Sequence, residues 1–578
     1  MSPLPEKPAG PRDPQLRYLF GGLGLLVAVA GGVWLSAKLG DTFAGTDSDI
    51  GTNPLAWLLR LVTGQATWPG TAATVSAAVL AVLATGLAVL ATRLFRRVRG
   101  RSGTTIDAQS RHLATPADAR DLGRKATAKK AARLRPGGID NRPGQAGIYL
   151  GDLVGTVQDV HASFEDTMVL IAGPRKGKST IWVIPMAVEA PGPVVLTSNK
   201  RDVHDATRDV RARTGHVWAF DPNDKLGLRQ DFWFDLPGEI TSIDVAREVA
   251  SHFAMGDRAA DARTDAYFDK EGETLLARLL LATARGQATL SDTFRWVQNP
   301  YDRTPVDLLT RSGDLLSAEA LEAQAELPDK QREGVYGTAR SFLSCLENPD
   351  ILRWVTPPKH TLPRFIASDF VASTDTLHSL SEEGEGSAGP LVAALTTAVF
   401  NAGRRRASRS PSGRLDPPCL SILDEAANVV RLRRLPALYS HFGSQGLPTV
   451  TVLQSWSQGV GVWGEAGMKA LWGAATVRIY GGGGADPAWL HDLSQMVGTY
   501  DRPKTSLSTG RGGTNVNHDA TDRPIYPVSD LASLPAGRAV AFISQHRPML
   551  LRTRPWMTGP YANDIRDSLA RWDPQPSL

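Results

Sequence analysis

The chain has 578 residues, enough for more than one domain and a large core, and its formal net charge is +5. The positive charge is concentrated in residues 96–145, which hold 13 Lys and Arg against 4 Asp and Glu, whereas residues 146–578 carry a net charge of −5. The composition therefore excludes a broad nucleic-acid-binding surface, and any contact with DNA has to be local. The chain has two cysteines, Cys345 and Cys419, which give no disulfide framework. Its histidines lack metal-binding spacing, which argues against a metal site built from His or Cys.

Two uncharged stretches near the N-terminus, residues 18–37 and 71–92, each reach the ~20 residues with which a helix crosses a ~30 Å hydrocarbon layer. The segment between them is acidic, whereas Lys and Arg precede the first stretch and follow the second. This pattern predicts a membrane hairpin with both chain ends in the cytoplasm. A signal peptide is the alternative for the first stretch, but the apolar run is long, no A-x-A site closes it and a second stretch follows.

The segment "DTMVLIAGPRKGKST", residues 166–180, has the form of a phosphate-binding loop. An apolar strand leads into a Gly- and Pro-rich turn, and an apolar helix follows, which is the arrangement that such a loop requires. The backbone N–H groups of the turn would face the phosphates, Lys178 would reach the β- and γ-phosphates, and the Ser179 hydroxyl would bind Mg²⁺. The candidate nucleotide-binding residues of this loop are Gly173, Pro174, Arg175, Lys176, Gly177, Lys178, Ser179 and Thr180.

Ala172 departs from the usual loop pattern, which has glycine five positions before Gly177. Alanine can make the same turn if its φ stays negative, whereas a larger side chain would crowd the turn. We therefore expect Ala172 to be tolerated and Lys178 to be indispensable.

Two later strands end in polar residues suited to hydrolysis. "CLSILDEAANVV" places Asp424 where a carboxylate can hold Mg²⁺, and Glu425 where one can polarise the attacking water. "PTVTVLQSWSQ" ends its strand at Gln454, whose amide can sense the γ-phosphate or orient the water. The alternatives are a solvated acidic pair and a helix-capping residue, but the upstream phosphate loop favours a catalytic set of Lys178, Glu425 and Gln454.

The remaining pattern is α/β, a doubly wound sheet interrupted by helices between the phosphate loop and Asp424. "GGGG", residues 481–484, is interpreted as a tight turn, and "STGRGGTNVNHD", residues 508–519, as a mobile loop in which Arg511 could touch DNA or a neighbour. The predicted domains are an N-terminal cytoplasmic tail (1–17), a transmembrane hairpin (18–95), a basic juxtamembrane linker (96–145), a nucleotide-binding domain in two parts (146–240 and 361–556), an all-α domain (241–360) and a C-terminal tail (557–578).

Taken as a whole, the sequence resembles the type IV coupling proteins, the TraG/TraD-type ATPases of bacterial conjugation. The segments that carry the resemblance are the hairpin, the linker, "AGPRKGKS", "TSNKRD", the helical insert, "LSILDEAANV", "GLPTVTVLQSWSQ" and "LASLPAGRAVAFI". The resemblance implies a membrane-anchored, RecA-like homo-hexamer that hydrolyses ATP with Mg²⁺. It further implies movement of relaxase-bound single-stranded DNA toward the inner-membrane components of a type IV secretion channel. The all-α domain would face the cytoplasm and receive the substrate.

Two positions depart from that family's pattern. Related proteins often have an arginine before the strand of Gln454 that acts on a neighbour's nucleotide, but "SHFGSQG", residues 440–446, has none, so Arg478 and Arg431 are the remaining candidates. The turn after "VVLT" often has an aspartate before its lysine, and Ser198 and Asn199 stand there instead.

Two other functions compete with this interpretation. An FtsK/TraB-type motor for double-stranded DNA usually ends in a small DNA-reading domain, for which the residues after Trp556 leave no room. A receptor ATPase for protein-only type IV secretion is compatible with the same nucleotide residues, because they say nothing of the cargo.

Overall fold

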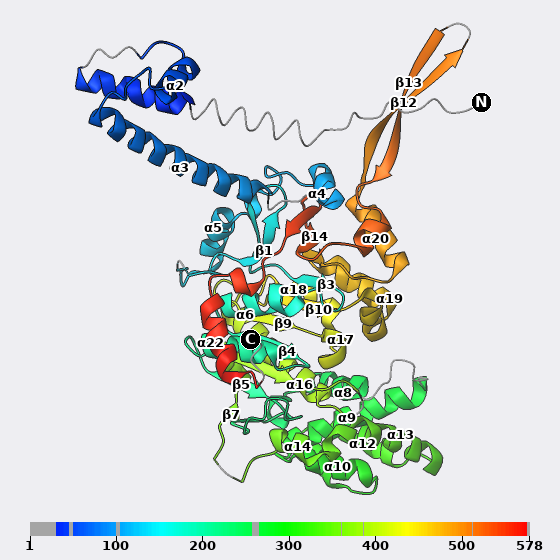
Figure 1. The fold of residues 1–578 in the computed structure, drawn as a ribbon. Coiled ribbons are helices and arrows are strands. Elements are labelled where there is room, and N and C mark those ends of the chain that lie inside the picture. The colour runs from blue at the N-terminus through cyan, green and yellow to red at the C-terminus, as the bar shows by residue number, and fades with distance from the viewer. Residues whose placement is uncertain are drawn as a thin grey trace. The chain divides into compact units, whose positions relative to one another are not determined.

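The structure is a computed structural model that describes residues 30–45, 50–99, 104–140, 142–256, 265–359, 361–384, 386–510 and 513–574 (Figure 1). The chain divides into two compact units, Met1–Gly103 and Thr104–Leu578. The predicted N-terminal tail, residues 1–17, lies outside the described residues.

The first unit is helical over residues 30–44, in α2 (Pro54–Val62) and in α3 (Thr71–Arg99). Asn53 caps α2, because its side-chain oxygen accepts the N–H groups of Leu55 and Ala56. Over the described part of the chain, no helix combines the length and apolar character that a membrane crossing requires. The predicted hairpin is therefore without structural support, and its first stretch is described only from residue 30 onward.

Within the described part of the second unit, eleven strands form one mixed sheet (Figure 1). Their spatial order is β2 (Asp159–Ala162), β1 (Ile148–Leu153), β15 (Met549–Arg552), β14 (Arg538–Ile543), β11 (Val477–Tyr480), β3 (Met168–Ile171), β10 (Thr449–Leu453), β9 (Leu420–Leu423), β4 (Val194–Ser198), β8 (Thr376–Leu380) and β5 (Val217–Phe220). The strands from β11 to β5 are parallel, whereas β14, β15, β1 and β2 are joined by antiparallel pairing. The central strands β3 and β10 are buried along their whole length because both faces of the sheet are covered.

Alternate residues of the strands face two different cores, so the predicted doubly wound sheet is confirmed. One face packs against α6 (Ile184–Glu189) and α7 (Asp202–Arg211). The other face packs against α16 (Gly389–Arg409), α18 (Leu435–Phe442) and α19 (Trp456–Ala474). Three further helices of this unit are α17 (Ala426–Val429), α20 (Pro487–Val497) and α21 (Val528–Ala532).

A helical insert leaves the sheet after the edge strand β5 and returns in its neighbour β8. Its helices are α8 (Ile243–Gly256), α9 (Ala266–Arg285), α10 (Leu290–Gln298), α11 (Thr304–Arg311), α12 (Leu315–Ala325), α13 (Asp329–Phe342) and α14 (Pro349–Leu352). A two-stranded sheet of β6 (Trp233–Phe234) and β7 (Arg364–Phe365), followed by α15 (Ala367–Phe370), stands where the insert joins the body. Leucines of α9 and α10 share one apolar core with the sheet, so the insert is packed onto the body.

Residues 104–145, set apart in the sequence as a linker, pack onto the second unit from residue 104 onward. They form α4 (Thr105–Gln109) and α5 (Arg124–Leu134). The Arg538 guanidinium donates to both oxygens of Asp107, at 2.7 and 2.8 Å, and the Tyr526 hydroxyl donates to the carbonyl oxygen of Ile106. The basic charge of this segment thus lies on a folded part of the body.

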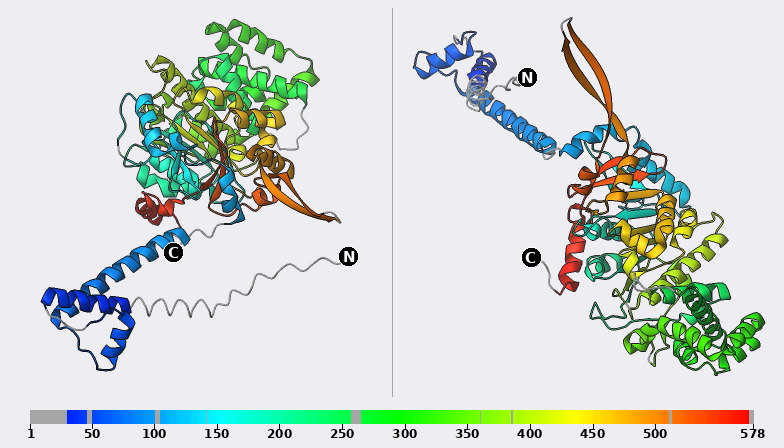
Figure 2. Two further views of the ribbon diagram at one scale, coloured as in Figure 1. Left: turned by 90° about the horizontal axis from the view of Figure 1, so that it is seen from above. Right: turned by 90° about the vertical axis from the view of Figure 1, so that its right-hand side faces the viewer.

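The prediction of a loop over residues 508–519 is wrong. The chain forms a long antiparallel hairpin of β12 (Thr499–Gly510) and β13 (Gly513–Pro524), which projects from the second unit in both views of Figure 2. Backbone pairing in continuous register satisfies the polar groups of a segment whose Ser, Thr and Asn residues suggested a loop. Arg511, a candidate DNA contact, lies outside the described residues.

Candidate nucleotide site

The predicted site residues gather at one edge of the sheet, where the parallel strands β3, β4, β8, β9, β10 and β11 all end. Ala172 follows β3, Asp424 and Glu425 follow β9, and Gln454 follows β10, which lies between those two strands. In open α/β sheets, ligands bind in the crevice outside the carboxyl ends of the strands. The fold therefore brings the phosphate loop and the polar strand ends together, although residues 178 and 424 are far apart in sequence.

The phosphate loop is anchored to its neighbours through the backbone. The N–H group of Ala172 donates to the carbonyl oxygen of Leu453 (3.1 Å), and that of Gly173 donates to Gly482 (2.8 Å). Arg175 (φ 59°) and Gly177 (φ 76°) adopt left-handed conformations. Such conformations, alternating with right-handed ones, turn successive N–H groups toward one side and form an anion-binding concavity. Pro174 and Arg175 are exposed, whereas residues 176–180 are partly buried.

Ala172 has no left-handed φ and is fully buried. This is the condition under which alanine can replace the usual glycine, since the restriction on a side chain arises mainly at positive φ. The departure at position 172 is therefore compatible with the turn that the loop makes.

The glycine run of residues 481–484 is a turn that packs directly on the phosphate loop. A Cβ atom added at Gly173 would lie 2.4 Å from the carbonyl oxygen of Gly483, so neither backbone has space for a side chain there. The Lys176 ammonium donates to the carbonyl oxygen of Leu534 (3.0 Å), which fixes the loop from the same side. The run has no phosphate-binding lysine and serves instead as the close neighbour of the loop.

The helix after the loop begins with a π-helical turn, Ser179–Val183, before α6. Pro185 has no N–H group to donate to the carbonyl oxygen one turn earlier, and a wider turn is one way for the helix to pass such a residue. The Ile181 N–H group and the Thr180 hydroxyl both donate to the carbonyl oxygen of Gly177, at 2.8 and 3.1 Å. These bonds hold Ser179 and Thr180 at the first turn, as the predicted phosphate and Mg²⁺ positions require.

Asp424 and Glu425 form a buried acidic pair. Glu425 adopts a left-handed conformation (φ 52°), and its N–H group donates to the Asp424 carboxylate (3.1 Å). Burial, the Glu425 charge and the Asp202 charge raise the pKa of Asp424 to about 7, against the opposing effect of Lys178. An excess of buried negative charge at this point is the environment that a divalent cation would stabilise.

Gln454 holds the Glu425 carboxylate directly, because its amide nitrogen lies 2.8 Å from both carboxylate oxygens. The Asn428 amide donates to Glu425 (3.4 Å) and to Glu383 (2.5 Å), and the Asn199 amide also donates to Glu383 (3.0 Å). The Gln458 amide completes the network by donating to Asn428 (3.0 Å).

Sequence reasoning missed the outer members of this network, namely Asn199, Glu383, Asn428 and Gln458. Asn428 and Gln458 stand three and four residues after Glu425 and Gln454, a spacing that places side chains on one helical face. That spacing is a signal that could have found them. Glu383 belongs to "SEEGEG" after β8 and gave no comparable signal.

The Lys178 ammonium lies over its own loop, donating to the carbonyl oxygens of Ala172 (3.0 Å) and Gly173 (3.4 Å). Burial lowers its pKa, while the nearby charges of Glu425 and Asp424 act in the opposite direction. Among the described residues, Lys178 forms no ion pair with a carboxylate. Its two partners are neutral carbonyl groups, which a phosphate can replace.

The two candidates for a trans-acting arginine are placed differently. Arg431 donates within its own chain, to the carbonyl oxygens of Ala427 (2.9 Å) and Met255 (3.3 Å). Arg478 lies partly buried in β11, and burial lowers the pKa of both arginines. Their action on a neighbouring subunit stays a prediction.

Residues 418–536 match the family described as the TraM recognition site of TraD and TraG. Among solved structures, the chain is similar to the bacterial conjugative coupling protein TrwBΔN70. For its trigonal form with sulphate the TM-score is 0.51 at 16% identity, over 74% of this chain and 92% of that one. For its unbound monoclinic form the TM-score is 0.50 at 17% identity, over 68% of this chain and 85% of that one. For TrwB in complex with ADP and Mg²⁺ the TM-score is 0.49 at 17% identity, over 70% of this chain and 89% of that one. No curated protein sequence matches the chain.

The fold defines the class of protein as RecA-like α/β, with a large mixed sheet and a phosphate loop at its carboxyl edge. The match over residues 418–536 is more specific, because it covers both Asp424 and Gln454. The matched segment agrees with the resemblance of the sequence motifs to the type IV coupling proteins.

Proposed function

We propose that this chain is a membrane-anchored ATPase that couples relaxase-bound single-stranded DNA to a type IV secretion channel during bacterial conjugation. The observation that carries the proposal is the meeting of Lys178, Asp424, Glu425 and Gln454 at one sheet edge, where Gln454 holds Glu425 at 2.8 Å. The match to the TraM recognition site of TraD and TraG supports conjugation as the setting.

The residues present fit ATP with Mg²⁺. The left-handed turn of the phosphate loop suits an anion, and the buried carboxylates of Asp424 and Glu425 suit a cation. Ser179 and Asp424 would hold the ion, and Lys178 and the loop N–H groups would hold the phosphates. The bound ion would neutralise charge that develops on the transferring phosphoryl group.

Glu425 is the residue that would take a proton from the attacking water. Its carboxylate is oriented by Gln454 and Asn428, so it does not need to reorganise when the reaction occurs. Lys178 would leave the carbonyl oxygens of Ala172 and Gly173 for the β- and γ-phosphates. The outer residues Asn199 and Glu383 would keep the Asn428 amide in place.

The anchoring and assembly extend the proposal. Residues 18–95 would form a membrane hairpin in the cell inner membrane, with both termini and the ATPase body in the cytoplasm, as the distribution of Lys and Arg indicates. A homo-hexamer would place an arginine of one subunit at the site of the next, with inner-membrane channel components as partners. The helical insert, predicted as residues 241–360, would receive the DNA–protein substrate.

The proposal is tested by plasmid transfer between cells that carry Lys178→Ala or Glu425→Gln in the full chain. Transfer should fall to background for both variants, with membrane levels of the protein unchanged. Transfer at the wild-type rate would exclude a motor that uses this site.

The cargo is tested separately with the purified full chain in detergent. We expect single-stranded DNA to raise the rate of ATP hydrolysis, and the effect to weaken with salt because phosphate contacts are electrostatic. ATP hydrolysis that is indifferent to single-stranded DNA would favour protein-only cargo, and stimulation by duplex DNA alone would favour an FtsK/TraB-type motor.

A further inference from the structure

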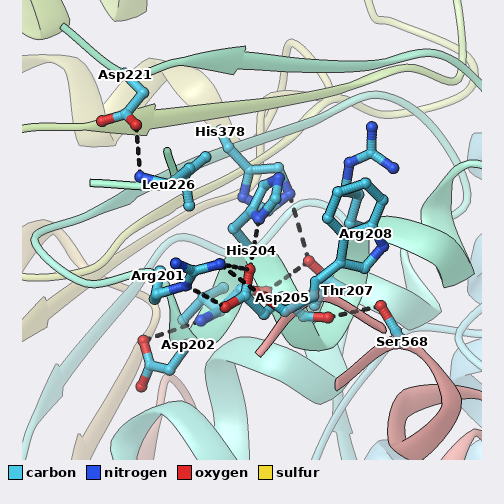
Figure 3. Close-up of polar contacts among 12 residues, drawn as sticks. Arg201, Asp202, His204, Asp205, Thr207, Arg208, Asp221, Leu226, His378 and Ser568 are labelled. Carbon is cyan, nitrogen blue, oxygen red and sulfur yellow. Dashed lines mark hydrogen bonds and ion pairs between the residues drawn. The ribbon is translucent and has the colours of Figure 1, made fainter. Parts of the chain in front are cut away.

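The predicted C-terminal tail contains a helix, α22 (Ala562–Trp572), that packs along α7. Ile565 and Ser568 are fully buried in α22, and Ile565 and Leu569 pack against the core on the α6 and α7 side of the sheet. The Ser568 hydroxyl donates to the carbonyl oxygen of Asp205 (2.6 Å) and accepts the Asp209 N–H group (3.3 Å). Figure 3 shows Ser568 on a separate helix, joined to α7 by a dashed line. Apolar burial and directional hydrogen bonds therefore set the position of α22 together.

Trp572, at the end of α22, is held at three points. Its indole N–H group donates to Asp209 (2.8 Å), the Arg208 guanidinium lies 3.8 Å from its ring centroid, and its carbonyl oxygen accepts a hydrogen bond from Arg201 (2.7 Å). Stacking of arginine on an aromatic ring adds to the hydrogen bonds in fixing the orientation. The contact to Arg201 differs from the other two in its location, because Arg201 precedes α7 and belongs to the loop after β4.

Arg201 connects the C-terminal helix to a buried polar cluster. Its guanidinium also donates to Asp205 (2.6 Å), which is 1% exposed and lies 3.0 Å from the His204 ring nitrogen (Figure 3). The fork geometry of arginine allows one side chain to bridge a carboxylate and a carbonyl group, which lysine does not do equally well. Arg201 therefore fixes the loop of residues 199–201 to α7 and to α22 at the same time.

The same loop reaches the candidate nucleotide site. Asn199, two residues before Arg201, donates to Glu383, whose oxygen also accepts the Asn428 amide that contacts Glu425. The Thr197 hydroxyl, at the end of β4, donates to the carbonyl oxygen of Asp424 (3.0 Å). The path from Trp572 to Glu425 thus consists of the hydrogen bond from Arg201 to the Trp572 carbonyl oxygen, one short loop, and hydrogen bonds among the side chains of Asn199, Glu383 and Asn428.

We infer that α22 fixes the loop of residues 199–201 and thereby orients the Asp424–Glu425 pair, so that Arg201, Ser568 and Trp572 are positioning residues for hydrolysis. This inference rests on the proposed function of the site. It assigns the C-terminal helix to the rate of the chemical step and not to nucleotide affinity, because none of its contacts reaches the phosphate loop. The Trp572 carbonyl oxygen contacts the loop itself through Arg201, whereas Ser568 and the Trp572 indole hold the adjacent helix α7.

The test uses the full chain with Trp572→Phe, Ser568→Ala and the double variant. Trp572→Phe keeps the ring beside Arg208 and removes the indole N–H group, so the fold should be preserved. Arg566→Ala is the matched control, because Arg566 is exposed on the same helix and donates hydrogen bonds to Asn563 and Met557, both outside α7 and the loop of residues 199–201. We expect kcat for ATP to fall about tenfold in the double variant, with KM within about twofold, since small displacements at a catalytic site cost rate.

Hydrogen–deuterium exchange of the segment 197–206 gives a readout that needs no activity. Exchange there should rise severalfold in the single and double variants and stay at the wild-type level in Arg566→Ala. Wild-type kcat and wild-type exchange in the double variant would overturn the inference. If the wild-type chain hydrolysed no ATP, the proposed function would fail, whereas unchanged exchange would show separately that α22 does not fix the loop.

Discussion

The amide nitrogen of Gln454 lies 2.8 Å from each oxygen of the Glu425 carboxylate, joining the ends of two neighbouring strands. Glu425 itself stands in a left-handed conformation that costs an ordinary residue free energy. The carboxylate is therefore held at a defined orientation from outside its own strand.

This relationship predicts the effect of Gln454→Ala. Without the amide, Glu425 keeps only the longer contact from Asn428, and kcat should fall by about 10²-fold, within the range by which a positioned base contributes. Nucleotide affinity should change little. The measurement is steady-state ATP hydrolysis together with binding of a fluorescent ADP analogue. Ser457→Ala, at an exposed position of α19, is the control, and equal kcat for both variants would contradict the role of Gln454.

The two residues that open the phosphate loop should respond in opposite ways to a change of one methyl group. Gly173→Ala forces a Cβ atom against the carbonyl oxygen of Gly483, so the loop and the residue 481–484 turn must separate, and nucleotide binding should weaken at least tenfold. Ala172→Gly should leave binding unchanged and cost about 1 kcal/mol of stability, since it frees the unfolded chain. Calorimetric titration with ADP and Mg²⁺ measures the nucleotide affinity of both variants, and urea unfolding measures the stability of Ala172→Gly. A gain of nucleotide affinity in Ala172→Gly would show that alanine at this position impairs nucleotide binding.

Substitution of Arg211 should affect the stability of the protein and not its nucleotide site. The Arg211 guanidinium is 2% exposed and donates to Thr376 and to the carbonyl oxygens of Ala190, Gly192 and Thr374, at 2.8 to 2.9 Å. Burial lowers its pKa to about 10. Arg211→Lys cannot make these contacts together and should destabilise the protein by about 3 kcal/mol, seen as a lower urea midpoint.

The control for that change is Arg213→Ala, because Arg213 is largely exposed and forms a surface ion pair with Asp564. Such pairs contribute about 0–1 kcal/mol. A similar loss of stability in both variants would contradict the structural role assigned to Arg211.

His252 predicts a dependence of stability on pH. It is buried in α8 with its Nε2 atom 2.9 Å from the Thr397 hydroxyl, and burial, with a smaller effect of Arg433, lowers its pKa from 6.5 to about 3. The ring is neutral in the folded protein, whereas the unfolded chain takes up a proton below pH 6.5. The free energy of unfolding should therefore fall with decreasing pH, by about 1.4 kcal/mol per pH unit between 6.5 and 3 from this group.

Burial lowers the pKa of His378 as well, so it contributes in the same direction. His252→Gln should remove the contribution of His252. The difference between wild type and variant in the free energy of unfolding, measured with urea, should narrow by about 1 kcal/mol from pH 6.5 to pH 5.5. An unchanged difference at the two pH values would show that the fold does not lower the pKa of His252.

The sequence predicted the phosphate loop, the Asp424–Glu425 pair and Gln454 because each stands at the end of an apolar strand, a local signal. The order of the strands was not predictable in this way. That β10 lies between β3 and β9 follows from packing along the whole chain, and so does the contact of Gly173 with residue 483.

The failures have equally specific reasons. The β12–β13 hairpin consists of polar residues whose pairing depends on backbone register, which composition does not reveal. The prediction of a tail over residues 557–578 overlooks Ile565, Leu569 and Trp572, which recur at helical spacing in α22. The helix that they face, α7, lies distant in sequence, so its contact with α22 was not predictable from local pattern. Glu383 joins the site only because β8 lies beside β4.

The position of β3 between β10 and β11 has a consequence for how the protein is made. Both partners of β3 are encoded late, so on the ribosome this fully apolar strand emerges long before the strands with which it pairs. The nucleotide site cannot assemble until the chain beyond Tyr480 has been synthesised, and the α22 helix follows later still. Nascent chains therefore expose an unpaired apolar strand for about half of their synthesis, a state prone to aggregation, and nucleotide binding becomes possible only late in synthesis.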